Sequence, residues 1–271
     1  MKIYLGLTKI KGPTILVLGM FDGIHIGHRR LINEAVKLSE NELSPVILCT
    51  FNKRPVEVLK PDIQPDRLTT TAQRAREVAS LGVNAMCIMK FDKEMANQEP
   101  EYFIENLVKT LNAEHIFVGY NYTFGKGGRG NGELLKQLGV KYGFKTHVKS
   151  RVSDHGETVS STRIRSLIKN GNVARANELL QYTYAMPVKF LKKQANEFHF
   201  EYLARKIIPK YGAYKCILTV NNINGINDYE VINLVQNKKC IALFAQDELL
   251  PCITEDSKIA LHYIDKLNIK R

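Results

Sequence analysis

The sequence predicts an α/β protein, with a doubly wound parallel sheet in its first part and a smaller β-rich domain after it. Three observations lead to this prediction. Short apolar segments without polar alternation recur between residues 14 and 149, as expected for parallel strands buried on both faces. Helical patterns separate these segments, and repeated strand–helix units build doubly wound sheets. After residue 187 the strand patterns follow one another directly, so we expect two domains, residues 1–186 and 187–271.

The strands of the first part are expected where β-branched and apolar residues cluster, at Thr14–Leu18, Val46–Phe51, Ala85–Met89, His115–Val118 and Lys145–Val148. Helices are expected where apolar residues recur on one face or where proline or glycine marks an end, at His28–Glu40, Thr71–Leu81, Pro100–Leu111, Ser161–Lys169 and Asn172–Leu180. Residues Tyr182–Pro187 have the composition of a linker. The later strands are expected at Val188–Leu191, Cys216–Val220, Val231–Val235, Cys240–Phe244 and Lys258–Ile264.

The most informative segment, Gly19–His28, follows the first expected strand and precedes the first expected helix. A strand that turns through glycines into a helix brings backbone N–H groups and the positive end of the helix dipole to one point, which suits phosphate. His25 and His28 add two side-chain donors around Gly27, where a Cβ would obstruct close approach. In open α/β sheets ligands bind outside the carboxyl ends of the strands, where this segment falls. We therefore interpret it as a triphosphate cradle for nucleotidyl transfer.

Three more segments follow expected strands and offer ligand contacts. Asn121 has the groups to bond a ribose or a base edge, and Phe124 has a ring that can lie flat against a planar ligand. The glycine-rich loop Gly125–Gly132 matches neither G-x-G-x-x-G nor a Walker A loop, so a surface turn is the alternative. Phe51–Pro55 lies on the same sheet edge and is a second candidate for ligand contact. The structural alternative is a loop whose hydrophobic residues only pack against the protein. Asp92, after a third expected strand, either serves a site or begins a turn.

Residues Ser160–Arg165 form a further candidate site, at the start of an expected helix. Capping of that helix by Ser161 or Thr162 is the structural alternative. Arg163 and Arg165 oppose the helix dipole, which costs stability and suggests that they serve an anion. Hydroxyls, backbone N–H groups and guanidinium forks together make a second phosphate-binding site.

Composition narrows the class of protein. Five cysteines are scattered without C-x-x-C spacing, and three of them lie in apolar runs, as buried free thiols do in a reducing compartment. No signal-peptide core and no apolar run of membrane-spanning length is present, so we expect a cytoplasmic protein without membrane contact. The net charge of +12 is spread along the chain without a basic block, which favours phosphorylated small molecules over nucleic acid as partners.

Taken together, these segments resemble the prokaryotic FAD synthetase family, the bifunctional riboflavin kinase/FMN adenylyltransferases. The shared motifs occur in the family's order, at Gly19–His28, Phe51–Pro55, Phe91–Asp92, Val118–Gly125, Ser160–Arg165 and Gly171–Leu180. The resemblance implies that residues 1–186 form a Rossmann-like nucleotidyltransferase domain. It also implies transfer of AMP from ATP to FMN, which gives FAD and pyrophosphate, with Mg²⁺ as cofactor and ATP and FMN as small-molecule substrates.

The resemblance also assigns roles to residues. His25 and His28 would bind the phosphates of ATP and stabilise charge at the α-phosphorus, while Arg165 would close on the departing pyrophosphate, so these three are the expected catalytic residues. The other expected ATP contacts are Gly19, Phe21, Asp22, Gly23, Gly27, Asn121, Ser161, Thr162 and Arg163. The expected walls of the flavin site are Phe51, Pro55 and Phe124. No protein nucleophile is needed, because the FMN phosphate attacks directly, and no metal-ligating side chain is assigned.

The chain departs from the family after residue 187. The family's kinase domain is a β-barrel with a Pro-Thr-Ala-Asn element that serves metal and ATP, and no such element occurs here. Residues 209–214 echo a later barrel motif, so we expect residues 187–271 to form a shortened, barrel-like domain without kinase activity. Alternatives are residual kinase activity, another small-molecule adenylyltransferase, and a non-catalytic flavin or nucleotide sensor. An aminoacyl-tRNA synthetase is disfavoured, because the residues around His25–His28 do not fit one.

Overall fold

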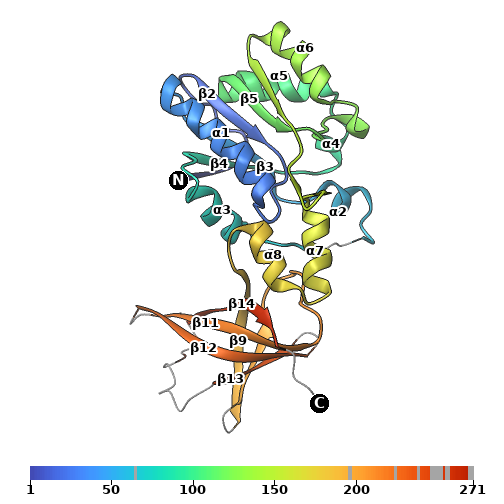
Figure 1. The fold of residues 1–271 in the computed structure, drawn as a ribbon. Helices are drawn as coiled ribbons and strands as arrows, with labels where there is room; N and C mark the ends of the chain where they lie inside the picture. The colour runs from blue at the N-terminus through green and yellow to red at the C-terminus, as the bar shows by residue number, and fades with distance from the viewer. Residues whose placement is uncertain are drawn as a thin grey trace. The chain divides into compact units, whose positions relative to one another are not determined.

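The computed structural model describes residues 1–63, 66–194, 197–222, 225–236, 239–244, 253 and 257–267 (Figure 1). Contacts divide the chain into two compact units, Met1–Pro65 with Thr71–Val159, and Asp66–Thr70 with Ser160–Arg271. The functional division expected near residue 187 stays a prediction. No helix in the described part of the chain is both long enough and apolar enough to cross a membrane.

The first unit is built on a six-stranded sheet in the order β1-β4-β3-β2-β5-β6, with every neighbouring pair parallel. Its strands are β1 (Lys2–Leu5), β2 (Thr14–Leu18), β3 (Val46–Phe51), β4 (Ala85–Met89), β5 (Ala113–Gly119) and β6 (Lys145–Lys149). The predicted parallel sheet is therefore confirmed. Strand β1 was not predicted, because this four-residue edge strand is largely exposed and lacks the apolar run of a buried strand.

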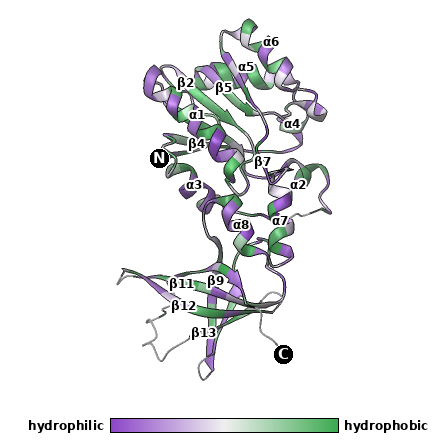
Figure 2. Cartoon of the chain, in the orientation of Figure 1, coloured by the Kyte–Doolittle hydropathy of each residue, from purple (hydrophilic) through white to green (hydrophobic). Residues whose placement is uncertain are grey.

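Helices cover both faces of this sheet, as doubly wound folds require. Ile15 and Val17 of β2 pack with α1 (Ile26–Glu42) and α3 (Thr71–Ala79). Leu16 and Leu18 alternate to the other face and pack with α5 (Pro100–Leu111) and α6 (Gly132–Tyr142). Burial on both faces explains why β2 is apolar along its length in Figure 2.

Smaller elements complete this unit. They are α2 (Pro55–Leu59), α4 (Lys93–Ala96), the 3₁₀ turn Lys126–Gly128, and the hairpin of β7 (Ser153–Asp154) and β8 (Glu157–Thr158). Helix α6 was not predicted, because glycines at both its start and its middle lower helix propensity. Gly139 is needed there, since a Cβ would lie 2.6 Å from the carbonyl oxygen of Phe144.

The strand order places a ligand crevice at one edge of the sheet. The chain runs from β2 outward through β3 to β4, and then returns to β5 on the other side of β2. Ligands of open α/β sheets bind outside the carboxyl ends of the strands at such a reversal. The segments that follow β2, β3, β4 and β5 lie at this edge, and they hold most of the predicted site residues.

The second unit contains α7 (Ser161–Lys169), α8 (Val173–Leu180) and a closed six-stranded antiparallel barrel. The barrel order is β10-β13-β12-β11-β14-β9, with strands β9 (Tyr184–Gln194), β10 (Glu197–Tyr202), β11 (Gly212–Asn222), β12 (Gly225–Gln236), β13 (Lys239–Phe244) and β14 (Lys258–Lys266). The predicted barrel-like domain is confirmed.

Two expectations about this unit need correction. The segment predicted as a linker, Tyr182–Pro187, runs into β9, where Tyr184 is fully buried and its hydroxyl donates to Ile207 O at 2.6 Å. Strand β10 was missed, although its alternation gave a signal, because Phe198 and Phe200 point into the core from positions two residues apart.

Candidate active site

A strained turn links β2 to α1. Phe21 and Ile24 have φ values of 50° and 38°, in the left-handed region that non-glycine residues avoid, and Gly23 between them has φ of 97°. Each such non-glycine residue costs about 1–3 kcal/mol, and the strain is most informative at a β-branched residue such as Ile24. Gly19 is required before the turn, because a Cβ would lie 2.9 Å from the Phe21 ring. Strain of this kind persists where the surroundings hold it in place.

The two histidines stack directly after this turn. His25 caps α1, and its Nδ1 accepts the backbone N–H of His28 at 3.4 Å, so the proton of the neutral ring is on Nε2. The two rings stack with centroids 3.7 Å apart and planes 16° apart. A Cβ on Gly27 would lie 3.2 Å from His25 Nδ1, and the Phe21 ring packs edge-on against His28 at 5.2 Å. Gly27 and Phe21 thus shape the histidine pair.

His28 is neutral in the folded protein and has an unused nitrogen. Burial, and secondarily the neighbouring His25, lower the pKa of His28 well below its usual value. Its Nδ1 is buried and has no hydrogen-bond partner among the described residues. The first turn of α1 contains no acidic residue, so nothing there offsets the positive end of the helix dipole. An anion bound at this point would meet the dipole and the imidazole pair together.

Two arginines that the sequence analysis did not single out hold the turn in place. Arg29 Nε donates to Ile24 O at 3.0 Å, and its guanidinium pairs with Glu77 of α3. Arg74, only 5% exposed, donates from Nη1 to Met20 O at 2.8 Å and to Thr50 Oγ1 at 3.3 Å. An arginine on the buried face of a helix is the signal that could have identified Arg74.

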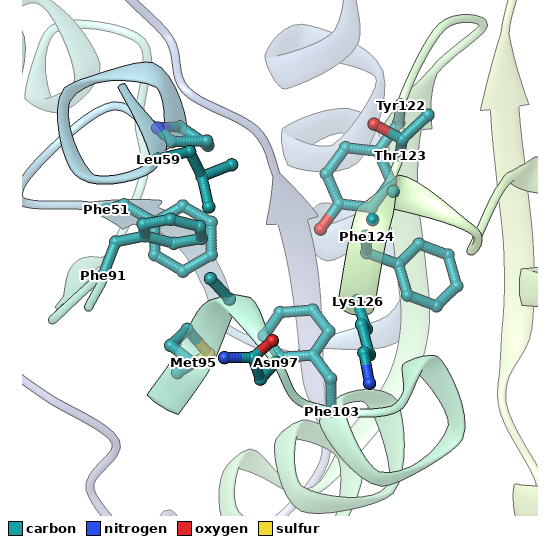
Figure 3. Close-up of a pocket in the computed structure, with 15 residues that line it drawn as sticks. Phe51, Leu59, Phe91, Met95, Asn97, Phe103, Tyr122, Thr123, Phe124 and Lys126 are labelled. Atoms are coloured by element: carbon teal, nitrogen blue, oxygen red, sulfur yellow. The ribbon is translucent and has the colours of Figure 1, made fainter. Parts of the chain in front are cut away.

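A cavity of about 350 Å³ lies beyond the ends of β3, β4 and β5, within the first unit. Figure 3 shows Phe51 and Phe91 on one side and Tyr122 and Phe124 on the other, with Phe103 at one end. Phe51 and Phe91 meet edge-on at 5.0 Å, while Tyr122 and Phe124 stack at 5.8 Å. The three residues predicted to wall a flavin site, Phe51, Pro55 and Phe124, all line this cavity.

The glycine-rich loop after β5 is anchored rather than a free surface turn. Phe124 and Gly130 exchange two backbone hydrogen bonds, at 3.1 and 2.9 Å. A Cβ on Gly130 would lie 2.5 Å from the Phe124 ring, so this glycine lets the ring pack. Lys126 N donates to Gln98 O at 2.7 Å, and Arg129 pairs with the Glu99 carboxylate. The loop therefore forms a fixed wall of the cavity.

The other predicted residues of the first unit differ in their surroundings. Asp22 is buried within the strained turn, with 6% of its surface exposed. Asn121 is exposed just past the end of β5, close to Gly119, and does not line the aromatic cavity. Asp92 caps α4 by accepting the backbone N–H of Met95 at 2.9 Å, which supports its turn-forming alternative.

The predicted second phosphate-binding site belongs to the second unit. Ser160, and not Ser161 or Thr162, caps α7, because its Oγ accepts the backbone N–H of Arg163 at 3.2 Å. Arg165 Nε donates to Asp66 O at 3.2 Å, which ties the helix to the segment Asp66–Thr70 of the same unit. The structural alternative, capping by Ser161 or Thr162, is therefore wrong for both residues, because the neighbouring Ser160 is the cap.

Among the described residues, no three His, Cys, Asp or Glu side chains gather into a metal-binding group. Cys49, Cys87, Cys216 and Cys240 are free and buried, and the fifth cysteine, Cys252, lies outside the described residues.

Comparison with known proteins agrees with this geometry. A family model described as FAD synthetase matches residues 7–163. The bifunctional riboflavin kinase/FMN adenylyltransferase of Escherichia coli (strain K12) is 32% identical over 221 residues, which cover 81% of this chain and 68% of that protein. A protein named FAD synthetase from Listeria monocytogenes is 29% identical over 231 residues, covering 84% of this chain and 91% of the relative.

One solved structure shows the same fold over the full chain. A crystal structure described as a macrolide-efflux protein from Streptococcus pneumoniae has a TM-score of 0.87 and 24% identity, and it covers 100% of this chain and 93% of that one. At this identity the likeness concerns the fold alone. The family match covers more than half of the chain and includes the strained turn, the histidine pair and the aromatic cavity. The chain therefore belongs to the FAD synthetase family.

Proposed function

We propose that this protein is an FMN adenylyltransferase, which transfers AMP from ATP to FMN. A phosphate oxygen of FMN attacks the α-phosphorus of ATP, a new P–O bond forms, and the bond from the α-phosphorus to the bridging oxygen breaks. Pyrophosphate leaves with that oxygen, and the product is FAD. The observation that carries the proposal is the stacked histidine pair, with an unpaired His28 nitrogen, at the ligand-binding edge of a parallel sheet.

His25 and His28 are the proposed catalytic residues of the first unit. As neutral donors beside the start of α1, they gain strength when negative charge grows on the phosphoryl oxygens. Such a transfer needs positioning and electrostatic stabilisation more than covalent chemistry. The turn residues proposed to contact ATP with them are Gly19, Phe21, Asp22, Gly23 and Gly27. Of these, Gly19, Phe21 and Gly27 act chiefly by shaping the turn around the rings.

The start of α7 supplies the proposed pyrophosphate contacts. Ser161, Thr162, Arg163 and Arg165 would hold the β- and γ-phosphates, and Arg165 is the catalytic member because it would contact the departing pyrophosphate itself. A permanent cation suits a multiply charged leaving group, which needs neutralising both before and after the transfer. Asn121 remains the proposed contact for the ribose or base of ATP.

The aromatic cavity is the proposed site of the flavin ring. Phe51, Pro55 and Phe124 line it together with other aromatic residues, and its volume suits a planar organic ligand. Aromatic rings on opposite sides favour a flat ligand between them through stacking.

Mg²⁺ is proposed to enter with ATP. This ion prefers oxygen ligands and is often held by substrate phosphates with one or two carboxylates. The strained turn contains a carboxylate at Asp22, and the substrates bring the phosphate oxygens, so the residues fit such a shared site. When bound, the ion would neutralise phosphate charge as the transfer proceeds.

The second unit is proposed to lack riboflavin kinase activity. The Pro-Thr-Ala-Asn element, which the kinase domain of the family would use for metal and ATP, is absent from residues 188–271. The division into domains 1–186 and 187–271 is proposed on the same grounds. A cut near Pro187 would interrupt β9 beside the buried Tyr184, so activity is best measured on the whole chain. Buried free thiols support a reducing, cytoplasmic location.

One assay tests the proposal. The purified protein is incubated with Mg-ATP and either FMN or riboflavin, and FMN, FAD and pyrophosphate are separated by chromatography over time. We expect FAD and pyrophosphate in equal amounts from FMN, and no FMN from riboflavin. Absence of FAD at micromolar enzyme would favour the flavin or nucleotide sensor. Accumulation of FMN above a control without enzyme would show that kinase activity survives.

A further inference from the structure

The aromatic cavity has a polar edge that the proposed function leaves unexplained. Most of its lining side chains are aromatic or aliphatic. Tyr122 and Thr123 add hydroxyl groups, whereas Asn97 and Lys126 bring an amide and an ammonium group, and Lys126 is the one charged residue among the lining residues described. Figure 3 shows both polar groups towards the Phe103 end of the cavity.

Two loops bring these groups together. Lys126 N donates to Gln98 O at 2.7 Å, so the residue next to Asn97 in the chain is bonded to Lys126 itself. Arg129 pairs with the Glu99 carboxylate, which joins the same two loops a second time. Both connections use backbone atoms or other side chains. They therefore position Asn97 and Lys126 without using the Asn97 side-chain amide or the Lys126 ammonium group.

The polar ends are available to a ligand. Asn97 Nδ2 donates to Lys93 O at 2.8 Å, which fixes the orientation of the amide and leaves Oδ1 as an acceptor. Within the described part of the chain, neither Asn97 Oδ1 nor Lys126 Nζ has a hydrogen-bond partner or an ion-pair partner. At this end the cavity thus offers one fixed acceptor and one cationic donor beside a largely apolar interior.

We propose that Asn97 and Lys126 recognise the pyrimidine edge of the flavin ring, an inference that rests on the proposed function. That edge has the sequence carbonyl, N3–H, carbonyl, and the opposite end of the ring has two methyl groups and no hydrogen-bonding group. Asn97 Oδ1 accepts from N3–H, and the ammonium of Lys126 donates to an adjacent carbonyl oxygen. The pair selects a flavin over other flat aromatic ligands, because the apolar lining alone does not distinguish them.

Binding of FMN in the absence of ATP tests this recognition, measured by quenching of flavin fluorescence on titration with the full-length protein. The probes are FMN and N3-methyl-FMN, which lacks the N3–H donor. Wild-type protein should bind N3-methyl-FMN about tenfold more weakly, the effect of one hydrogen bond to a fixed partner. Asn97→Ala should weaken FMN binding by about the same factor and bind both probes equally.

Lys126 is tested by a second set of variants. Lys126→Met should weaken binding of both probes by about tenfold and keep the preference for FMN, while Lys126→Arg should retain most of the affinity. Lys136→Met is the matched control, because Lys136 is an exposed α6 lysine that does not line the cavity, and it should bind as wild type does. Thermal denaturation of each variant checks that it is folded.

The outcomes separate this inference from the function on which it rests. If wild-type protein binds FMN and Asn97→Ala still prefers FMN over N3-methyl-FMN by the wild-type ratio, the recognition is wrong and the function stands. Should Asn97→Ala fail to fold, equal binding of FMN by wild type, Lys126→Met and Lys136→Met overturns the inference. No binding of FMN by wild type would overturn both the inference and the proposed function.

Discussion

Helices α1 and α7 both begin at a proposed phosphate site, yet they present different chemistry there. Helix α1 begins behind a strained turn and two stacked imidazoles, with His28 held neutral by burial. Helix α7 begins at a serine cap, with Arg163 and Arg165 near its start. Neither helix has an acidic residue in its first turn, so both leave the positive end of the dipole unopposed.

Because of this difference, we expect the two helix ends to contribute to different steps of the reaction. A neutral donor gains most when charge develops on its partner, so it acts mainly in the transition state. A permanent cation attracts the phosphates of ATP at every stage, so it contributes to binding of substrate and product alike. We therefore expect changes at α1 to act on kcat and changes at α7 to act on KM.

The largest effect is expected at α1. His28→Ala should lower kcat by about 10²-fold or more, the size seen when a preorganised donor to a reacting group is lost, with a smaller change in the KM for ATP. Steady-state formation of FAD at varied ATP measures both quantities. His155→Ala is the control, because His155 is an exposed histidine of the β7–β8 hairpin. A His28→Ala enzyme within twofold of wild type would assign His28 a purely structural role.

A smaller effect is expected at α7. Arg165→Ala should raise the KM for ATP and the Kd for pyrophosphate by about tenfold or more, through loss of charge-assisted hydrogen bonds. The lost bond from Arg165 Nε to Asp66 O would itself account for about 1 kcal/mol of stability. Kinetics, pyrophosphate titration and thermal denaturation separate the two effects. Loss of stability and of activity in equal proportion would assign Arg165 to packing.

Arg74 provides a test of whether the strained turn needs support from its neighbours. Arg74→Lys keeps the charge but loses the guanidinium, whose Nη1 donates to Met20 O and Thr50 Oγ1 and whose Nη2 donates to Phe51 O, so the turn should shift. We expect kcat to fall by about tenfold, with little change in the KM for ATP, because misplaced donors mainly weaken the transition state. Arg76→Met, on the exposed face of the same helix, is the matched control. An unchanged kcat in folded Arg74→Lys protein would contradict this positioning role.

The smallest effect concerns stability and pH. Because the pKa of His28 is lowered in the folded protein, the unfolded chain binds a proton at higher pH than the folded one. Below about pH 6.5 the free energy of unfolding should therefore fall as pH falls, by at most about 1.4 kcal/mol per unit from this residue, down to its folded pKa. The pKa values of His115 and His147 are also lowered, chiefly by burial, and add in the same direction.

Comparison of wild type with His28→Asn isolates the part that belongs to His28. Denaturant unfolding of both proteins between pH 5 and 8 should show a shallower pH dependence in the variant. Parallel curves would mean that His28 titrates alike in the folded and unfolded chains.

We could predict the parallel sheet, most of its helices and the order of the family's motifs from local patterns in the sequence. Buried strands such as β2 to β4 were predictable because a strand covered on both faces must be apolar throughout, which is a local property of the sequence. The clustering of the three residues proposed to wall the flavin site was predictable for a related reason. Phe51, Pro55 and Phe124 follow strands whose carboxyl ends share one edge of the sheet, and all three line one cavity.

Tertiary structure alone decided what supports these residues. The role of Arg74 depends on contacts with Met20 and Thr50, 54 and 24 residues away in the chain, and no local pattern encodes such a pairing. The neutral state of His28 depends on burial, and the polar edge at Asn97 depends on a bond between two separate loops. Local periodicity records which face of an element is buried, whereas hydrogen bonds between distant segments exist only once the chain has folded.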